Sequence, residues 1–117
     1  MGVVKMRMWN TDVTKMCNKH LLGEHLEMHM FLGCLKKGTS ITGYIDKGLV
    51  EVHNIPKRHE ELVVEMKKRG MNHNSDVPLC LELEEVGCVN VEENEIELMR
   101  RCGECRKIRE SMMVVSK

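Results

Sequence analysis

The sequence predicts an all-α fold: a compact single domain over residues 1–117, with about three main helices joined by long loops. In three separate stretches, apolar side chains recur at steps of three and four residues, the spacing of one helix face. Glycines follow basic residues at the ends of two of these stretches, as at many helix C-termini. The chain has one Trp, one Tyr and one Phe against eleven Met, so its core must rely on Met, Leu, Val and Ile.

The first helix is expected to begin after a cap at Asn10 or Thr11 and to run to Lys36 or Lys37. Gly38 is its stop signal, because glycine readily adopts the left-handed conformation that ends many helices. At about 25 residues it is the longest element predicted.

Three ionisable side chains share one face of this first helix. His20, Glu24 and Glu27 follow one another at steps of four and three residues, on a face that otherwise carries apolar side chains. Burying a carboxylate without a partner is costly, so a protein that does so usually needs the group. We expect Glu24 to support the structure by pairing with Arg7 or Arg58.

The second helix is expected after a cap at Asn54, with Pro56 in its first turn and Gly70 after its last. Residues 38–53 and 71–78 read as loops, because they are rich in Gly, Ser, Thr, Asn and Asp.

The C-terminal segment, residues 79–117, is expected to be mostly one further helix. Residues 79–83 alternate apolar and other side chains, which indicates a short extended piece. The third helix should start near Val91, behind an acidic first turn. Its core face includes Leu98, Cys102, Cys105 and Met112.

Charge and cysteine content narrow the functional classes. The formal net charge is zero, which argues against strong indiscriminate binding to phosphate. Residues 1–78 hold all six His and 12 Lys/Arg against 9 Asp/Glu, so a nucleic acid would meet that part. No secretory segment or membrane-length apolar run is visible, and the six cysteines are expected as free thiols. We expect an intracellular protein, cytoplasmic or associated with DNA, without membrane contact.

Two ordered motifs resemble the pyrimidine-dimer DNA glycosylases, the dimer-excising endonuclease V of the phage type. The first is His20-Leu21-x-x-Glu24-x-x-Glu27, within a Lys-His-Leu-Leu-Gly-Glu-His run. The second is Arg58-x-x-Glu61-Leu62-x-x-Glu65-x-x-Lys68-Arg69-Gly70-x-Asn72. Met6-Arg7-Met8-Trp9 resembles the chain start of cellular members, and the likeness covers roughly residues 6–78.

The resemblance implies a DNA repair glycosylase with associated AP lyase activity on damaged double-stranded DNA, without a cofactor or metal. In this family an N-terminal α-amine attacks C1′ of the damaged nucleotide, and a carboxylate on the first long helix assists. Glu27 matches that carboxylate. The amine aligns with Met6, which leaves residues 1–5 as an N-terminal extension; Gly2 would carry the amine if only Met1 is removed.

The resemblance also implies a set of DNA contacts. Two arginines that flank the catalytic glutamate in phage members are replaced here by Leu26 and Met30, which should weaken binding and its salt dependence. The DNA-binding residues expected are Arg7, His20, Arg58, Lys68 and Arg69, with His25 and His29 as partial substitutes for the two arginines.

Two other functions stay open. One is a catalytically inactive nucleic-acid-binding relative of the same fold, which the two lost arginines favour. The other is a small Cys-rich metal-binding interaction module, with Cys80, Cys88, Cys102 and Cys105 as its four thiolates. The irregular spacing before Cys102 favours buried thiols without metal, and the helical pair His25-x-x-x-His29 lacks an evident third ligand.

Overall fold

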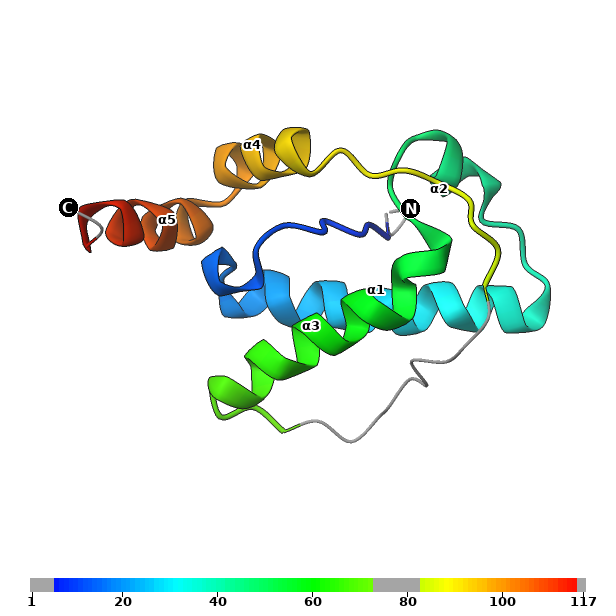
Figure 1. The fold of residues 1–117 in the computed structure, drawn as a ribbon, viewed down its shortest axis with the longest axis horizontal. Coiled ribbons are helices and arrows are strands. Elements are labelled where there is room, and N and C mark those ends of the chain that lie inside the picture. The colour runs from blue at the N-terminus through cyan, green and yellow to red at the C-terminus, as the bar shows by residue number, and fades with distance from the viewer. Residues whose placement is uncertain (1–5, 73–82, 116–117) are drawn as a thin grey trace, which may run out of the picture.

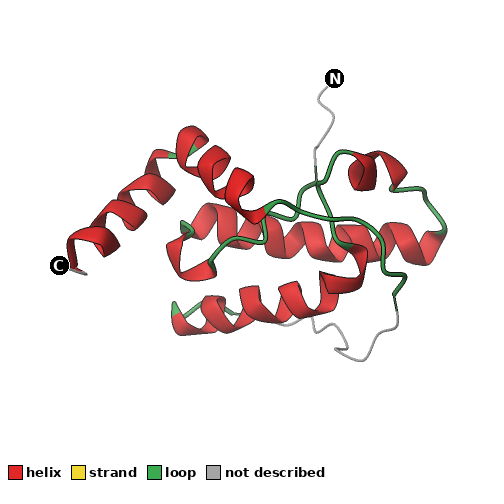
Figure 2. Cartoon of the chain, turned by 45° about the horizontal axis from the view of Figure 1, so that its top comes forward, coloured by secondary structure: helices red, strands yellow, loops and turns green. Residues whose placement is uncertain are grey.

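The structure, a computed structural model, describes residues 6–72 and 83–115, which consist of helices and loops without a strand (Figures 1 and 2). This confirms the all-α prediction. The helices of the described part are α1 (Asn18–Lys37), α2 (Thr42–Asp46), α3 (Ile55–Lys68), α4 (Val91–Arg101) and α5 (Gly103–Val115), with 3₁₀ turns at Val13–Lys15 and Val52–Asn54.

Helices α1 and α3 pack against each other and form the centre of the domain (Figure 1). α1 buries Leu21, Met28 and Phe31 against its neighbours, and α3 buries Ile55 and Leu62. The remaining core is rich in methionine, as the shortage of aromatic residues predicts. Its buried methionines are Met6, Met8, Met16, Met28 and Met66.

The first helix begins later than predicted. A 3₁₀ turn at Val13–Lys15 comes before it, capped by the side chain of Asp12, and α1 starts only at Asn18. The predicted cap at Asn10 or Thr11 is therefore wrong. Short polar side chains compete with helix by bonding nearby backbone groups, and Asp12 does so here. At the other end, Gly38 has a φ of 77° and stops α1 as predicted.

The second predicted helix is confirmed as α3, with Pro56 in its first turn and Gly70 beyond its end at a φ of 80°. Asn54 precedes it, but its side chain donates to Glu51 at 2.6 Å instead of capping the helix. The loop predicted over residues 38–53 contains α2, which at five residues is too short to show a periodic apolar stripe.

The third predicted helix is two helices in the structure. α4 begins at Val91, where Asn90 accepts a hydrogen bond from the amide of Glu93 at 3.0 Å. Cys102 is extended, with φ −121° and ψ 109°, and α5 follows it directly. Residues 79–82 of the predicted extended piece, and the side chain of Met112, lie outside the described residues.

An extended N-terminal segment, residues 6–10, runs between α1 and α4 (Figure 1). The Met8 amide donates to the carbonyl of Leu49 at 2.7 Å, and Asn94 of α4 donates to the carbonyl of Trp9 at 2.9 Å. Because these bonds join segments that lie far apart in the sequence, the start of the described chain is held firmly against α1. None of the described helices has the length and apolar character needed to span a membrane.

Candidate active site

A buried ion pair joins α1 to α3. The Nε and Nη2 atoms of Arg58 donate to the two carboxylate oxygens of Glu24 at 2.6 and 2.9 Å. The two side chains are 3% and 0% exposed. Breaking a buried pair by removing one partner typically costs about 3–5 kcal/mol, because a charge stays behind in the core. This confirms the supporting role expected for Glu24, with Arg58 as its partner.

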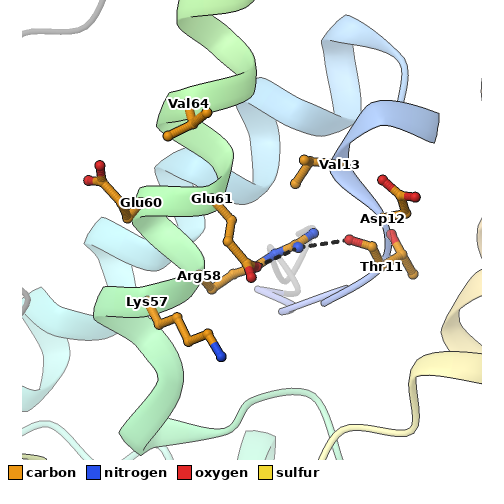
Figure 3. Close-up of a pocket in the computed structure, with 8 residues that line it drawn as sticks. All are labelled: Thr11, Asp12, Val13, Lys57, Arg58, Glu60, Glu61 and Val64. Atoms are coloured by element: carbon orange, nitrogen blue, oxygen red, sulfur yellow. Dashed lines mark hydrogen bonds and ion pairs between the residues drawn. The ribbon is translucent and has the colours of Figure 1, made fainter.

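The same contacts argue against the predicted DNA contact of Arg58. Its Nη1 atom donates to the carbonyl of Thr11 at 2.7 Å and to Glu61 at 3.2 Å (Figure 3). With all three guanidinium nitrogens engaged inside the protein, Arg58 has no group to offer a phosphate. The resemblance alone could not separate these roles, because an arginine next to DNA and one inside a core look the same in a motif.

Glu27 lies about one turn beyond Glu24 on α1. One of its carboxylate oxygens accepts the backbone N–H of Arg7 at 2.6 Å. Burial raises the pKa of Glu27 to about 6; the Arg7 amide and cation oppose this shift, and the negative charge of Glu24 adds to it. A carboxyl group with this pKa is mostly ionised at neutral pH and still binds a proton readily, which suits a group that transfers protons.

A pocket of about 310 Å³ opens beside Glu27. The guanidinium of Arg7 lies over the ring of Trp9, 4.0 Å from its centroid, and donates to Asn94 at 2.7 Å. These two contacts fix the Arg7 cation at the pocket wall. The residues that line the pocket are Arg7, Trp9, His20, Glu27, Lys47, Leu49 and Arg101.

The charge of this pocket combines one carboxyl group with three cationic side chains. The cations are those of Arg7, Lys47 and Arg101. Burial and the charge of Arg101 lower the pKa of Arg7. The guanidinium of Arg7 nevertheless stays protonated. Burial and nearby Lys19 lower the pKa of His20, so its imidazole is neutral at neutral pH. A carboxylate among cations is an arrangement suited to a phosphate-bearing sugar whose C1′ gains positive charge.

Sequence reasoning missed Lys47, Arg101 and Asn94 in this site. Lys47 follows the short helix α2, and Arg101 ends α4 in the segment that shows no family motif. A Lys-Gly pair after a turn and an Arg at a helix end are common features of ordinary surfaces. No local signal distinguishes these residues, and only tertiary packing places them in the site: Asn94 and Arg101 come from α4, and Lys47 from the end of α2.

The first described residues lie next to Glu27. Met6 is buried and directly precedes Arg7, whose amide bonds the carboxylate. One residue spans at most about 3.6 Å, so the backbone nitrogen of Met6 lies within about 6 Å of the Glu27 oxygen that accepts the Arg7 amide. Gly2, the other position considered for the amine, lies outside the described residues.

The two histidines expected to replace lost arginines lie elsewhere. His25 and His29 pack against His59 of α3, with ring centroids 4.9 and 4.7 Å from it. Two residues along a helix correspond to a rotation of about 200°, so both rings sit on the side of α1 that faces away from Glu27. Their placement does not support a DNA contact beside Glu27. It does bring His59 to the pair His25 and His29, as the third possible metal ligand that the sequence did not reveal.

The basic end of α3 divides into one exposed and one engaged side chain. Lys68 is exposed. Arg69 donates to Glu65 at 2.9 Å and to the carbonyl of Val13 at 3.0 Å, so it ties the end of α3 to the turn before α1. Of this pair only Lys68 presents its charge outward.

Of the cysteines considered for metal binding that the structure describes, Cys102 and Cys105 lie together. They are next to Cys17, the residue before α1. Cys88 is exposed, and Cys80 lies outside the described residues.

A larger cavity of about 520 Å³ lies between residues 11–13 and α3 (Figure 3). Arg58 and Glu61 meet at its wall, while Glu60 points away from residues 11–13. Its one buried cation, Arg58, is already paired with Glu24. Size alone therefore does not make it the reactive site.

A family model described as pyrimidine dimer DNA glycosylase matches residues 6–79, well over half of the chain. The chain belongs to the pyrimidine dimer DNA glycosylase family. The match confirms the resemblance read from the motifs. It starts at the residue that precedes Arg7 and includes the N-terminal segment, α1 and α3. Comparison with curated proteins and with solved structures gave no match.

Membership of the pyrimidine dimer DNA glycosylase family makes this chain a DNA repair protein of the glycosylase class that binds DNA. Most of the residues that line the pocket at Glu27 belong to the part of the chain that the family model matches: the N-terminal segment, α1 and Lys47. Arg101 comes from outside the matched residues, so this chain completes the pocket with its own C-terminal part.

Proposed function

We propose that this protein excises the base at pyrimidine dimers and then nicks the strand as an AP lyase, through a Schiff base with an N-terminal amine and with the assistance of Glu27. One observation carries the proposal. The carboxyl group whose pKa is raised to about 6 accepts the amide of Arg7, directly after the position that aligns with the family's nucleophile.

The reaction follows from these groups. A neutral α-amine, whose ordinary pKa is about 7.7–8.0, attacks C1′ while the bond from C1′ to the base breaks. The ionised Glu27 stabilises the positive charge that develops at the sugar and accepts the proton that the amine loses. The proton taken up by Glu27 passes to O4′ as the C1′–O4′ bond breaks and the sugar ring opens, and the imine formed at C1′ acidifies the C2′ proton. Loss of that proton and departure of the 3′ phosphate by β-elimination break the strand, and water then hydrolyses the imine and frees the amine.

The cations of the pocket act on the substrate strand. Arg7 is held in place by Trp9 and Asn94, so its charge is preorganised for a phosphate next to the lesion. Lys47 and Arg101 extend this positive rim. Reaching the lesion requires bending the duplex and displacing a base, which costs least where damage has already weakened stacking. We place this reaction inside the cell, on damaged double-stranded DNA.

A duplex with a single cyclobutane dimer tests the proposal. The active protein should nick the strand at the dimer, and borohydride should trap a covalent protein–DNA adduct. An undamaged duplex of the same sequence should give neither product. Binding without a nick or an adduct, on both dimer and abasic DNA, would contradict the enzymatic function and favour the second candidate.

That second candidate is a DNA-binding relative without catalysis, and the surface of α1 beside the pocket favours it. Leu26 is 59% exposed and Met30 38% exposed, at the positions where phage members carry arginine. These apolar side chains offer no phosphate contact. Binding should therefore be weak and only mildly dependent on salt.

Restoring both arginines should strengthen DNA binding and its dependence on salt. In the double variant Leu26→Arg/Met30→Arg, the slope of log K against log salt for duplex DNA should steepen by about 1.8, since each phosphate contact contributes about 0.9. Fluorescence anisotropy at several salt concentrations measures the slope. Val64→Arg is the control, because Val64 is exposed on α3 and lies outside the Glu27 pocket. An increase per arginine as large in the control would show that only net charge matters.

A further inference from the structure

Three cysteines and one histidine from distant parts of the chain meet next to the pocket. Cys17 and His20 lie at the start of α1, and Cys102 and Cys105 lie at the junction of α4 and α5. The Cys17 sulfur is 3.3 Å from His20 Nδ1 and 3.8 Å from the Cys102 sulfur. The Cys105 sulfur is 3.7 Å from the same His20 nitrogen. All four donor atoms lie within 4.8 Å of one another.

These separations match the edges of a zinc tetrahedron. With Zn–S bonds of about 2.3 Å and Zn–N bonds of about 2.0–2.1 Å, tetrahedral angles put two sulfurs about 3.8 Å apart and a sulfur and a nitrogen about 3.6 Å apart. The Cys17 and Cys102 sulfurs are 3.8 Å apart, His20 Nδ1 is 3.3 Å from the Cys17 sulfur and 3.7 Å from the Cys105 sulfur, and the remaining separations are at most 4.8 Å. One ion at the centre of the cluster would therefore reach all four donors with little movement.

The backbone around the sulfurs also fits bound thiolates. The amide of Cys17 donates to the Cys105 sulfur at 3.3 Å, and the amide of Cys105 donates to the Cys102 sulfur at 3.4 Å. Such outer donors stabilise the negative charge of metal-bound thiolates and fix their orientation. Each ligand pair is separated by two residues in the sequence, the short interval common in zinc sites.

We propose that Cys17, His20, Cys102 and Cys105 bind one Zn²⁺ ion in a closed structural site. Four protein ligands fill the tetrahedron, which leaves no position for a reacting water. The ion joins the junction of α4 and α5 to the start of α1, and so holds the end of α4, which carries Arg101, beside the pocket. It also fixes the ring of His20 through Nδ1. Cys102 and Cys105 lie beyond the residues that the family model matches.

Metal analysis of the full chain, purified without chelators or metal-affinity resin, tests this site. We expect one zinc per chain by mass spectrometry of the digested protein. Cys105→Ser and His20→Ala should lose the ion. His20→Cys should keep it, because a thiolate can replace the imidazole as fourth ligand. Cys88→Ser is the matched control and should retain full zinc, since Cys88 is exposed and away from the cluster.

A second measurement covers variants that fail to fold. Chelator treatment of the unaltered chain should lower its melting temperature, and Zn²⁺ but not Mg²⁺ should restore it. In the cobalt-substituted protein, thiolate-to-cobalt absorption should report three sulfur ligands. A chain that contains no zinc, with thiols that react freely and a melting temperature insensitive to Zn²⁺, would overturn the proposal. So would zinc that persists in Cys105→Ser but is lost in His29→Gln, which would assign the ion to the histidine cluster.

Discussion

A chain that starts at Met6 is expected to form about 100-fold more borohydride-trapped adduct on abasic DNA than the 117-residue chain. The backbone nitrogen of Met6 lies within about 6 Å of the Glu27 oxygen bonded to the Arg7 amide, as one residue spans at most about 3.6 Å. An amine at Gly2 comes four residues earlier in the sequence than Met6. Displacement of a reacting group by even about 1 Å can cost about 100-fold in rate, so the position of the amine dominates the outcome.

The comparison requires a protein whose first residue is exactly known. Release from a cleavable fusion gives a chain with a free α-amine on Met6, and mass spectrometry verifies each start. Peptide mapping of the trapped adduct then identifies the attacking nitrogen as that of Met6, Gly2 or the Lys5 side chain. Acetylation of the Met6 amine should abolish the adduct. Equal trapping by both chains, with the adduct on Gly2, would show that the extension delivers its own amine to the pocket.

Glu27→Gln is expected to reduce base excision at a dimer by about 100- to 10,000-fold, the usual contribution of a positioned acid–base group. The glutamine still accepts the Arg7 amide but holds no negative charge and takes up no proton. In the unaltered protein, the excision rate should rise with pH through about 6, as Glu27 ionises. At higher pH, the protonation state of the amine should determine how the rate depends on pH. Single-turnover excision rates measured between pH 5 and 8 test both statements.

The effect of Glu27→Gln on the free energy of unfolding has a sign that follows from the pKa of Glu27. The pKa of Glu27 in the folded protein is about 6, above the ordinary value of 4.5, so folding disfavours the ionised form. The free energy of unfolding should therefore fall as the pH rises from about 4.5 through 6, and Glu27→Gln should remove this loss. Its melting temperature should match that of the unaltered protein at low pH and exceed it at pH 7.5.

The matched control is the same change about one turn away on α1. Glu24→Gln removes one partner of the buried pair with Arg58 and should lower the melting temperature clearly at pH 7.5. The two variants should thus separate the two roles: Glu27→Gln should lose activity without losing stability, and Glu24→Gln should lose stability. If Glu24→Gln melted normally and Glu27→Gln unfolded, the division of roles between these two residues would be wrong.

Local patterns in the sequence determined the central elements of this protein. The apolar spacing and the glycine after Lys37 are properties of neighbouring residues, so they predicted the long helix α1 and its end correctly. The same holds for α3 with its proline start. The family motifs lie on these two helices and on the segment before them, which is why the family could also be identified from sequence.

Tertiary packing decided the break between α4 and α5 and the composition of the reactive pocket. The periodic pattern continues through Cys102, so it gave no sign that the backbone would turn extended there. That turn brings the cysteines of the C-terminal part to Cys17 and His20, and brings Arg101 to the pocket of Glu27. These contacts join residues that are about 75 to 88 positions apart in the sequence. The bond from the Cys17 amide to the Cys105 sulfur, for example, spans 88 positions.

The line of His20, Glu24 and Glu27 on α1 shows both contributions. Helical spacing alone put the three side chains on one face, as the sequence indicated. Their different roles come from what packs on that face: Arg58 neutralises Glu24, the Arg7 amide meets Glu27, and cysteine sulfurs surround one nitrogen of His20. A sequence determines periodicity through bonds between near neighbours, whereas the partner of each side chain depends on how distant segments pack.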